Sequence, residues 1–359
     1  MSSPDMIAAC ERLMRVGSHS FFAASRILPK RFRYAATAVY AFCRVADDAV
    51  DEMPHGASLN VVMAYLHERL DAIYRGEPFA IDADCAFAGV VHEYGIPKSI
   101  PLALLEGFQW DASGRQYETL DDLYDYAARV AGTVGAMMTL IMGGRSAKTV
   151  ARACELGVAM QLTNIARDIG EDAQRGRIYL PLQWLKEEGI SPDEFLRNPM
   201  FDERMARITR RLLMHADQLY QRAETGIAAL PYDCRSAIMA ARLIYAQIGA
   251  QIRRAGFDSI HQRAVVSRQY KWVLMARAAA AYLISPPKDF LITPLPAIEF
   301  LVNAVPVGEQ DVVRHASIGS VIGVLERARL RERGQLIGRG ARSEPGERGE
   351  PNQARSGRF

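Results

Sequence analysis

Two acidic clusters carry the clearest chemical signal in the sequence, Asp47-Asp48-Ala49-Val50-Asp51 and Asp168-Ile169-Gly170-Glu171-Asp172. Each continues an apolar segment of helical period. On a helix, residues four positions apart share a face, so Asp47 projects with Asp51, and Asp168 projects with Asp172. Like charges at this spacing repel each other, and burial raises the cost. A cation is the expected partner, and carboxylate oxygens suit Mg²⁺, which keeps other positions for water or phosphate oxygens.

Arginine and amide side chains complete each cluster. Arg44 precedes Asp47 by one helical turn, where a guanidinium can reach a phosphate oxygen. In the second segment Asn164, Asp168 and Asp172 step by four and share one stripe. Beside that stripe, or just after it, stand Gln161, Arg167, Glu171, Arg175 and Arg177. Both segments therefore predict Mg²⁺ held by carboxylates, with arginines against a diphosphate.

Each cluster taken alone also has a structural interpretation. The first would be a solvated helix end whose ion pairs contribute little to stability. The second would be a polar contact between helices. Two observations favour a metal at the first cluster: the helix dipole disfavours acids near a C-terminus, and the preceding turns are too apolar for an exposed helix. The occurrence of two such clusters strengthens the metal interpretation, because buried polar groups need partners.

Composition narrows the class of protein. The 359 residues are 49% hydrophobic, enough for a large core, and a net charge of +3 gives no sign of nucleic-acid binding. Five cysteines without C-x-x-C spacing argue against a disulfide framework and against structural zinc, and favour a reduced setting. Because neither a signal peptide nor a long apolar run is apparent, we expect a cytoplasmic protein whose membrane contact, at the inner membrane, is peripheral.

Helical periodicity dominates the chain, which predicts an all-α fold. Helices are expected at about 4–16, 31–51, 58–75, 82–94, 99–112, 120–143, 146–173, 181–188, 200–229, 233–255 and 266–284. The proline-rich segment 285–306 is expected to be an irregular connector, followed by a last helix at 309–333. We expect the domain to cover 1–333, and the basic segment 334–359, rich in Gly, Arg, Glu and Pro, to be a disordered tail.

These features suggest a helical barrel with an apolar interior and acidic side chains at its mouth. Mg²⁺ and arginine would neutralise the charge on a departing diphosphate. The carbocation left behind needs a dry pocket lined by aromatic groups. Candidates for the lining are Phe21, Phe22, Tyr40, Tyr126 and Tyr245, although aromatic residues at helical spacing often serve only as core.

Over roughly residues 10–285 the sequence resembles the squalene/phytoene synthase family, and its bacterial phytoene-forming members in particular. The resemblance rests on SHSFF at 18–22 followed by SRILP, YAFCRVADDAVD at 40–51, VAGTVG at 130–135 after Tyr126, and QLTNIARDIGEDAQRGRIYLP at 161–181. It implies an all-α fold, a single isoprenoid-synthase-type helical domain with a central apolar cavity. It also implies head-to-head condensation of two geranylgeranyl diphosphates to phytoene through prephytoene diphosphate. The chain departs from the family pattern after Tyr126, where Ala127, Ala128 and Arg129 follow.

The resemblance also assigns roles to residues of these motifs. The Mg²⁺ ligands it implies are Asp47, Asp51, Asp168 and Asp172, supported by Asp48, Asn164 and Glu171. The diphosphate contacts it implies are Arg44, Arg167 and Arg177, with Ser18 and Ser20 at the entrance. Tyr126 would stand near the cationic centre, and the substrate site would be lined by Tyr40, Gln161, Tyr245 and Arg263.

The implied partners follow from this chemistry. They are prenyl diphosphate substrates and Mg²⁺, with Mn²⁺ as a substitute and without a nicotinamide cofactor. Because the product is a C40 hydrocarbon, we also expect peripheral membrane contact through an apolar or basic surface, and contact with downstream carotenoid enzymes.

Three alternatives remain at this point. A synthase of the same family could use farnesyl diphosphate to make dehydrosqualene or hydroxysqualene, because a few wall residues set the depth of the pocket. Reductive squalene synthesis is less favoured, because neither a membrane anchor nor a dinucleotide motif is apparent. A non-catalytic assembly protein of the same fold is disfavoured, because that role does not require four intact aspartates.

Overall fold

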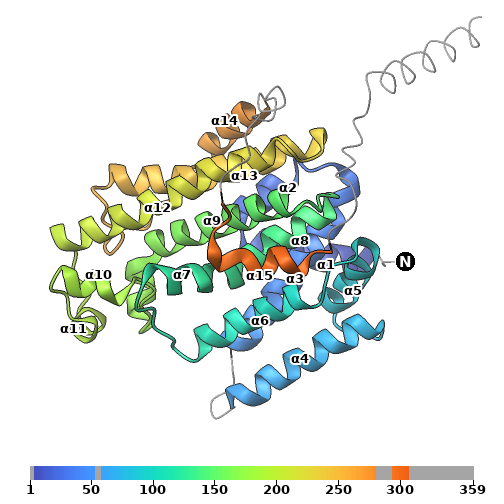
Figure 1. Ribbon diagram of the computed structural model, residues 1–359, viewed down its shortest axis with the longest axis horizontal. Helices are drawn as coiled ribbons and strands as arrows, with labels where there is room; N and C mark the ends of the chain where they lie inside the picture. Colours follow the sequence, from blue (N-terminus) through green and yellow to red (C-terminus); the bar gives the residue numbers. More distant parts are fainter. Residues whose placement is uncertain (1–3, 53–57, 280–292, 307–359) are drawn as a thin grey trace, which may run out of the picture. The chain divides into compact units, whose positions relative to one another are not determined.

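Helices make up the described structure (Figure 1). The computed structural model describes residues 4–52, 58–279 and 293–306, all within one compact unit, Met1–Asp311. These ranges contain no β-strand, which confirms the all-α prediction. The α-helices are α1 (Pro4–Gly17), α2 (His19–Ser25), α3 (Lys30–Asp51), α4 (Leu59–Arg75), α5 (Asp82–Tyr94), α6 (Ser99–Ala112), α7 (Leu120–Ala127), α8 (Thr133–Ile141), α9 (Ala147–Gln174), α10 (Leu182–Glu187), α11 (Pro192–Arg197), α12 (Glu203–Ile227), α13 (Tyr232–Arg254), α14 (Arg268–Ala279) and α15 (Glu299–Ala304). A π-helical turn, η1 (Ala128–Gly132), joins α7 to α8, and a 3₁₀ turn, η3 (Pro296–Ile298), precedes α15.

Some predictions concern residues outside these ranges. They are the last helix at 309–333, the domain end at residue 333 and the tail at 334–359. Within the described part of the chain, no helix combines the length and the apolar character needed to cross a membrane.

Helix α9 is the central element of the fold (Figure 1). It packs against α12, α13, α8, η1 and α15. An unbroken run from Cys154 to Met160 is buried, as expected for a helix with neighbours on all sides. The polar residues near its C-terminal end therefore continue a helix that is otherwise part of the core.

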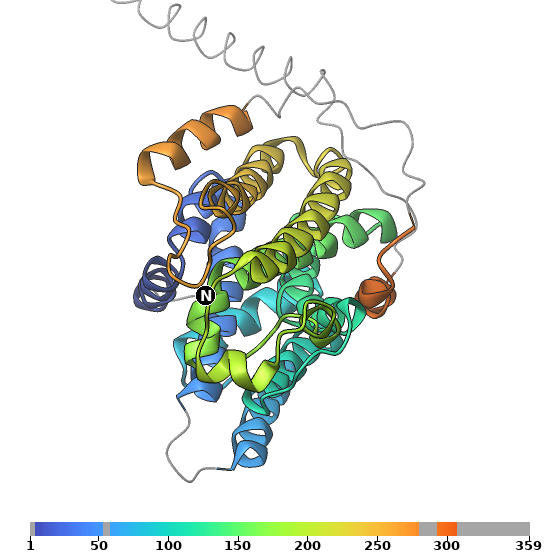
Figure 2. The same ribbon diagram turned by 90° about the vertical axis from the view of Figure 1, so that its left-hand side faces the viewer.

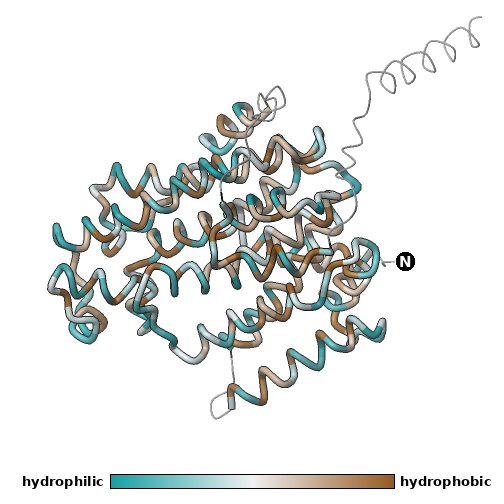
Figure 3. The backbone as a smooth tube through the Cα atoms, in the orientation of Figure 1, coloured by the Kyte–Doolittle hydropathy of each residue, from teal (hydrophilic) through white to brown (hydrophobic). Residues whose placement is uncertain are grey.

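The outer helices bury one face each. In α12, Ile208, Leu212 and Ala216 recur every four residues and are buried against α9. The helix begins at Asp202, whose carboxylate accepts a hydrogen bond from the backbone N–H of Met205 at 3.0 Å. Figure 3 shows the same pattern along α4, where hydrophobic and hydrophilic residues alternate at helical spacing.

The segment predicted as one helix from 120 to 143 contains the π-helical turn. The backbone N–H of Thr133 donates to the carbonyl of Ala128, five residues earlier. The hydroxyl of Thr133 donates to the carbonyl of Arg129 at 2.5 Å, which gives that carbonyl a partner. The prediction of an unbroken α-helix is therefore wrong at this turn, where a side chain replaces a backbone donor.

The proline-rich segment is not an irregular connector in its described part, 293–306. Instead it forms η3 and α15, which pack on α9. The buried carboxylate of Glu155 accepts the backbone N–H of Leu295 at 3.1 Å, and Arg222 donates to the carbonyl of Thr293 at 2.5 Å. Leu301 is fully buried. These contacts order the segment, and they could not be predicted from its proline content.

Two further short helices are absent from the predicted set, although each has a start signal. The Ser18 hydroxyl accepts the N–H of Phe21 at 3.2 Å and caps α2. At α11 the hydroxyl of Ser191 accepts the N–H of Glu194 at 3.4 Å, and proline occupies the first helical position.

Two glycines allow α9 to lie directly against the η1–α8 segment. A Cβ atom on Gly157 would be 2.2 Å from the carbonyl oxygen of Ala131, and a Cβ on Gly135 would be 2.2 Å from that of Ala153. No side chain fits at these distances, because the atoms that it would meet belong to the backbone. The two glycines therefore set the separation of these helices.

We expect Gly157→Ala to lower the free energy of unfolding by about 1–3 kcal/mol, because the methyl group forces two backbones apart. Thermal unfolding measures the change. Gly89→Ala is the matched control, because the nearest heavy atom to its Cβ would be the Tyr34 hydroxyl oxygen at 3.9 Å. That variant should be as stable as the original chain or slightly more stable. Equal melting temperatures for the two variants would contradict the close contact.

Candidate active site

Two apolar cavities lie next to each other among α2, α3, α8, α9 and α13. The first has a volume of about 200 Å³ and the second about 180 Å³. The residues that line both cavities are Phe21, Val134, Met138, Ile238 and Ala241. The two spaces are therefore separated by a single layer of side chains.

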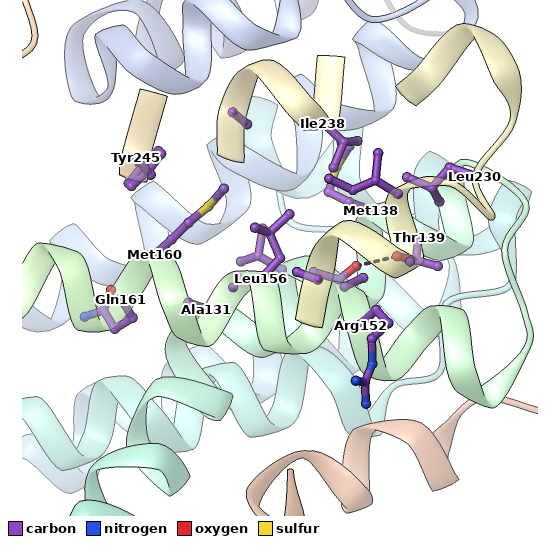
Figure 4. A pocket seen from close by; sticks show the side chains of 18 of the residues that line it. Ala131, Met138, Thr139, Arg152, Leu156, Met160, Gln161, Leu230, Ile238 and Tyr245 are labelled. Atoms are coloured by element: carbon purple, nitrogen blue, oxygen red, sulfur yellow. Dashed lines mark hydrogen bonds between the residues drawn. The ribbon is translucent and has the colours of Figure 1, made fainter. Parts of the chain in front are cut away.

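The first cavity follows α9 (Figure 4). Gln161 and Tyr245 lie at one end, Leu156 lies in the middle, and Leu230 lies toward the other end. The guanidinium group of Arg152 points away from the space (Figure 4) and pairs with Glu155 at 3.0 Å. Only the apolar part of Arg152 therefore contributes to the wall.

The cavity lining covers a long stretch of α9. It extends from Asn164 to Thr149, a separation of fifteen residues. At the rise of an α-helix this corresponds to about 22 Å.

Aromatic side chains stand where the two cavities meet. Phe21 lies between Tyr40 of the second cavity and Tyr245 of the first, with ring centroids 6.1 and 5.9 Å apart. Ser18 hydrogen-bonds to Tyr245, where it partly offsets the effect of burial, which raises the tyrosine's pKa. Four predicted site residues therefore gather here, Ser18, Tyr40, Gln161 and Tyr245.

Two other predicted residues are placed differently. The backbone of Ser20 belongs to α2, and its side chain lies outside the described part of the structure. Phe22 lines neither cavity, contrary to expectation. Its ring instead lies against the guanidinium groups of Arg15 and Arg26, 5.3 and 5.9 Å from the ring centroid.

The first acidic cluster occupies the last turns of α3. Arg44 donates to Asp48 through Nε at 3.0 Å and pairs with the other carboxylate oxygen at 2.5 Å. Its contact with Asp47 is longer, 3.8 Å. Asp51 pairs with Arg177 at 2.9 Å. In this cluster Asp47 therefore has the weakest positive partner.

The second acidic cluster occupies the last turns of α9. Arg167 binds both carboxylate oxygens of Asp168, at 2.8 and 2.5 Å. Arg263, 95 residues later, contacts Asp168 at 2.8 Å and Glu171 at 3.2 Å. The Asn164 amide donates to the Gln161 side-chain oxygen at 3.4 Å, a long contact.

Arginines link the two acidic clusters. Arg177 follows α9, yet it pairs with Asp51 at the end of α3, 126 positions away. Arg263 reaches the second cluster from the segment between α13 and α14. These ion pairs therefore bring together three segments of sequence: the end of α3, the end of α9 with the loop after it, and the segment that carries Arg263.

The carboxylates of this region are electrostatically unequal. Burial, and then the charges of Asp51 and Asp111, raise the pKa of Asp47 to about 7. Burial, Asp168 and Asp111 likewise raise the pKa of Asp172 to about 7. Burial acts in the same direction on Asp168, but hydrogen bonds from Arg167 and Arg263 hold its pKa below the usual range. Each helix thus presents one carboxylate whose negative charge is poorly compensated.

Tyr126 lies outside both cavities, buried beside a residue that the motifs do not contain. Its hydroxyl donates to Asp111 at 2.8 Å, and the hydroxyl of Tyr179 donates to the other oxygen of Asp111 at 2.8 Å. Ala127 and Ala128, where the chain departs from the family pattern, are fully buried at the start of the π-helical turn. An acid at the end of the apolar helix 99–112 was the signal that could have revealed Asp111.

Arg129, the third residue at which the chain departs from the family pattern, points to a different surface. Its guanidinium pairs with Glu106 at 2.8 Å and lies 4.2 Å from the ring centroid of Trp110. This side chain therefore helps to hold α6 against η1, away from the acidic clusters.

Comparison with known proteins shows the family of the chain. A sequence model of the squalene/phytoene synthase family matches residues 14–270. A phytoene synthase of Cereibacter sphaeroides is 47% identical over 329 residues, 89% of this chain and 93% of that protein. A phytoene synthase of Rhodobacter capsulatus is 52% identical over 270 residues, 75% of this chain and 80% of that protein.

Solved structures show the same fold. A dehydrosqualene synthase in complex with a ligand superposes with a TM-score of 0.70 at 30% identity, over 77% of this chain and 96% of that chain. A squalene synthase from Alicyclobacillus acidocaldarius gives a TM-score of 0.65 at 26% identity, over 71% of this chain and 97% of that chain. The predicted isoprenoid-synthase-type fold is therefore confirmed, and the chain belongs to the squalene/phytoene synthase family.

Proposed function

We propose that this chain joins two geranylgeranyl diphosphates head to head and forms phytoene through prephytoene diphosphate. The observation that carries the proposal is the pair of apolar cavities with a shared wall, because the reaction needs two prenyl chains side by side. Relatives that are named phytoene synthase and cover most of the chain support the same activity. As a member of this family the chain is a prenyltransferase-type enzyme, as predicted.

The depth of the first cavity favours a C20 substrate over a C15 substrate. An extended carbon chain advances about 1.2 Å per bond, as a peptide backbone does, so a geranylgeranyl chain reaches about 18 Å and a farnesyl chain about 13 Å. The cavity lining covers about 22 Å of α9. A farnesyl chain would leave the far end empty, and an unfilled apolar cavity forfeits contacts.

The residues of the site divide the work of the reaction. The arginines around the acidic clusters, Arg44, Arg167, Arg177 and Arg263, would neutralise the diphosphate as it leaves. The apolar cavity walls would exclude water from the carbocation. Gln161, Asn164 and Tyr245 would place the reacting end of the chain beside the acidic clusters.

The acidic clusters fit Mg²⁺ as the cofactor. Their donors are carboxylate oxygens, and Asp47 and Asp172 carry poorly compensated charge, which a cation would relieve. No three His, Cys, Asp or Glu side chains in the described ranges form a complete metal site by themselves. We therefore propose that Asp47, Asp51, Asp168 and Asp172, with Asp48, Asn164 and Glu171 nearby, bind Mg²⁺ together with the substrate diphosphate. When bound, the metal would polarise the leaving group.

We further propose that α14 contacts an anionic membrane surface. Two apolar side chains of α14 are exposed, Trp272 by 64% and Val273 by 51%, and Val265 just before the helix is exposed by 70%. Residues 261–279 contain four Arg or Lys and no acidic residue. Apolar side chains beside basic ones suit an anionic lipid surface.

The position of α14 suits the same role. Helix α14 lies beside α13 (Figure 2). Met275 and Ala278 pack on Met239 and Ala240 of α13, and other residues of α13 line both cavities. A hydrocarbon product would therefore form one helix layer away from the lipid. Contact with downstream carotenoid enzymes would take place on the same membrane.

The first test is incubation of the purified protein with geranylgeranyl diphosphate and Mg²⁺, without a nicotinamide cofactor, beside a farnesyl diphosphate reaction. We expect a C40 triene from the first reaction and none with Asp47→Ala. A C30 product alone would favour dehydrosqualene or hydroxysqualene synthesis. Absence of product from both substrates would favour the assembly role.

A bulky side chain at Ala153 should shorten the first cavity. Ala153 lines the cavity eleven residues from Asn164, about 16 Å along α9. We expect Ala153→Phe to lose kcat/KM for geranylgeranyl diphosphate and to retain activity on farnesyl diphosphate. The control is Ala147→Phe at an exposed position of the same helix. An unchanged preference in Ala153→Phe would contradict the assignment of chain length to this cavity.

Asp47→Asn should change the pH dependence of stability in metal-free protein. Because burial and neighbouring acids raise the pKa of Asp47 to about 7, the folded protein loses stability as the pH rises from about 4 to 7. The variant lacks this loss, so its melting temperature relative to wild type should be higher at pH 8 than at pH 5. Asp48→Asn is the control, because it removes the partner of Arg44.

The same measurement tests the metal. Mg²⁺ with pyrophosphate should raise the melting temperature of wild type and raise that of Asp47→Asn much less. An equal rise in both proteins would exclude Asp47 as a ligand.

Membrane contact is tested by flotation with vesicles that contain anionic lipid. We expect the wild type to float at low salt, and we expect Trp272→Ser with Val273→Ser to remain in solution, because the apolar contacts are lost. Tyr65→Ser with Val61→Ser on α4 is the matched control, since both side chains are exposed there too. Recovery of the wild type entirely in the soluble fraction would disprove the proposal.

A further inference from the structure

Asp111 lies at the end of α6, outside the residues assigned so far, and holds two tyrosines. One carboxylate oxygen accepts the Tyr126 hydroxyl and the other accepts the Tyr179 hydroxyl, each at 2.8 Å. Tyr126 belongs to α7, and Tyr179 follows α9. The rings of Tyr126 and Tyr179 stack at 5.3 Å, and the buried ring of Tyr117 is 5.1 Å from Tyr126. One carboxylate therefore joins three segments of the chain.

This group lies beside both acidic clusters. The charge of Asp111 contributes to the raised pKa of Asp47 on α3 and to that of Asp172 on α9. Arg177, which pairs with Asp51, also interacts with Asp111. Another acid in this crowded region costs stability, so a role in the site explains its presence better than stability does.

Asp111 is poorly suited to be a further metal ligand. Each of its two oxygens already accepts a phenol hydroxyl. A metal would have to compete with two hydrogen bonds at 2.8 Å. The carboxylate is instead arranged to act through the tyrosines.

The direction of these hydrogen bonds determines what the phenols can do. A phenol has one hydrogen to donate and also accepts through its oxygen. Because Asp111 takes the hydrogen from Tyr126 and from Tyr179, each oxygen can offer only lone pairs to any other group. A nearby negative carboxylate also makes both oxygens more electron-rich. Such an oxygen stabilises positive charge and cannot protonate an alkene.

We propose that Asp111 is a positioning residue for the condensation: by accepting both hydroxyl hydrogens it leaves Tyr126 and Tyr179 with only lone pairs to offer beside the acidic clusters, and it prevents either hydroxyl from donating to the substrate. The inference rests on the proposed function. It concerns the orientation of hydroxyl hydrogens and is independent of which chain length the cavity accepts.

Asp111→Asn tests this role, because the amide has the same shape and only one accepting oxygen. The amide can accept from one tyrosine, and its NH₂ group must donate to the other, which reverses that hydroxyl. We expect kcat to fall about 10–100-fold with little change in KM, as for the loss of other orienting partners. A larger share of the C40 product should leave as an alcohol or as the cyclopropyl diphosphate.

A second variant separates orientation from loss of charge. In Tyr179→Phe the second hydroxyl is absent, so Asn at position 111 can accept from Tyr126 without reversing another hydroxyl. Adding Asp111→Asn to Tyr179→Phe should therefore lower kcat much less than adding it to wild type. Asp125→Asn is the matched control, since Asp125 is next to Tyr126 and its carboxylate holds neither hydroxyl. That control should keep the wild-type kcat, and thermal unfolding would verify that all variants fold.

Three outcomes would overturn the proposal. First, Asp111→Asn could have the same kcat as Asp125→Asn. Second, Asp111→Asn could lower kcat as much in the Tyr179→Phe background as in wild type. Third, Asp111→Asn could change only the Mg²⁺ concentration needed for half-maximal rate. The last outcome would make Asp111 a charge that acts on the metal. Failure of wild type on geranylgeranyl diphosphate would instead refute the proposed function.

A measurement without substrate keeps those two failures apart. NMR of tyrosine-labelled protein should show slowly exchanging hydroxyl protons for Tyr126 and Tyr179. Asp111→Asn should alter these signals, and Asp125→Asn should leave them in place. Rapid exchange of both hydroxyls in wild type would refute the positioning role, whatever reaction the enzyme catalyses.

Discussion

The rest of the site depends on one electrostatic constraint, the crowding of carboxylates at the ends of two apolar helices. Two acidic clusters that end α3 and α9 face the same region, and burial makes their mutual repulsion costly. Arginines of the same two helices, Arg44 and Arg167, pair with these carboxylates, and so do two from elsewhere in the chain, Arg177 and Arg263. Asp47 and Asp172 nevertheless stay poorly compensated. A site built this way favours positive charge, whether it arrives as a metal ion or develops on a carbon atom.

Helix α9 connects that charge to the apolar part of the site. Its last turns carry the second acidic cluster, and its earlier turns form the wall of the first cavity. Close contact at Gly157 and Gly135 sets the distance between α9 and the η1–α8 segment, which also lines this cavity. On the far side, Glu155 anchors the segment before α15. The C-terminal turns of α9 therefore carry the charged groups of the site, and its earlier turns form the apolar wall.

The relatives place this arrangement within a family that shares a fold and differs in substrates. A dehydrosqualene synthase superposes over most of the chain, so the helical framework alone does not distinguish the two activities. The proposed preference for a C20 chain rests instead on the length of the cavity along α9. The hydrogen bonds to Asp111 also fix the direction of the hydroxyl groups of Tyr126 and Tyr179.

The sequence by itself determined the long helices, both acidic clusters and the family, because helical period and charge spacing are local properties of the chain. It missed the short helices α2 and α11. It did not reveal α15, the π-helical turn or Asp111, since each depends on partners distant in sequence: Glu155 for the segment before α15, the packing against α9 for the turn, and two tyrosines for Asp111. Only the tertiary structure decided which aromatic residues line a cavity. Phe22 and Tyr126 were predicted to line the pocket, but neither lines a cavity. Phe22 packs against the guanidinium groups of Arg15 and Arg26, and the Tyr126 hydroxyl donates to the carboxylate of Asp111.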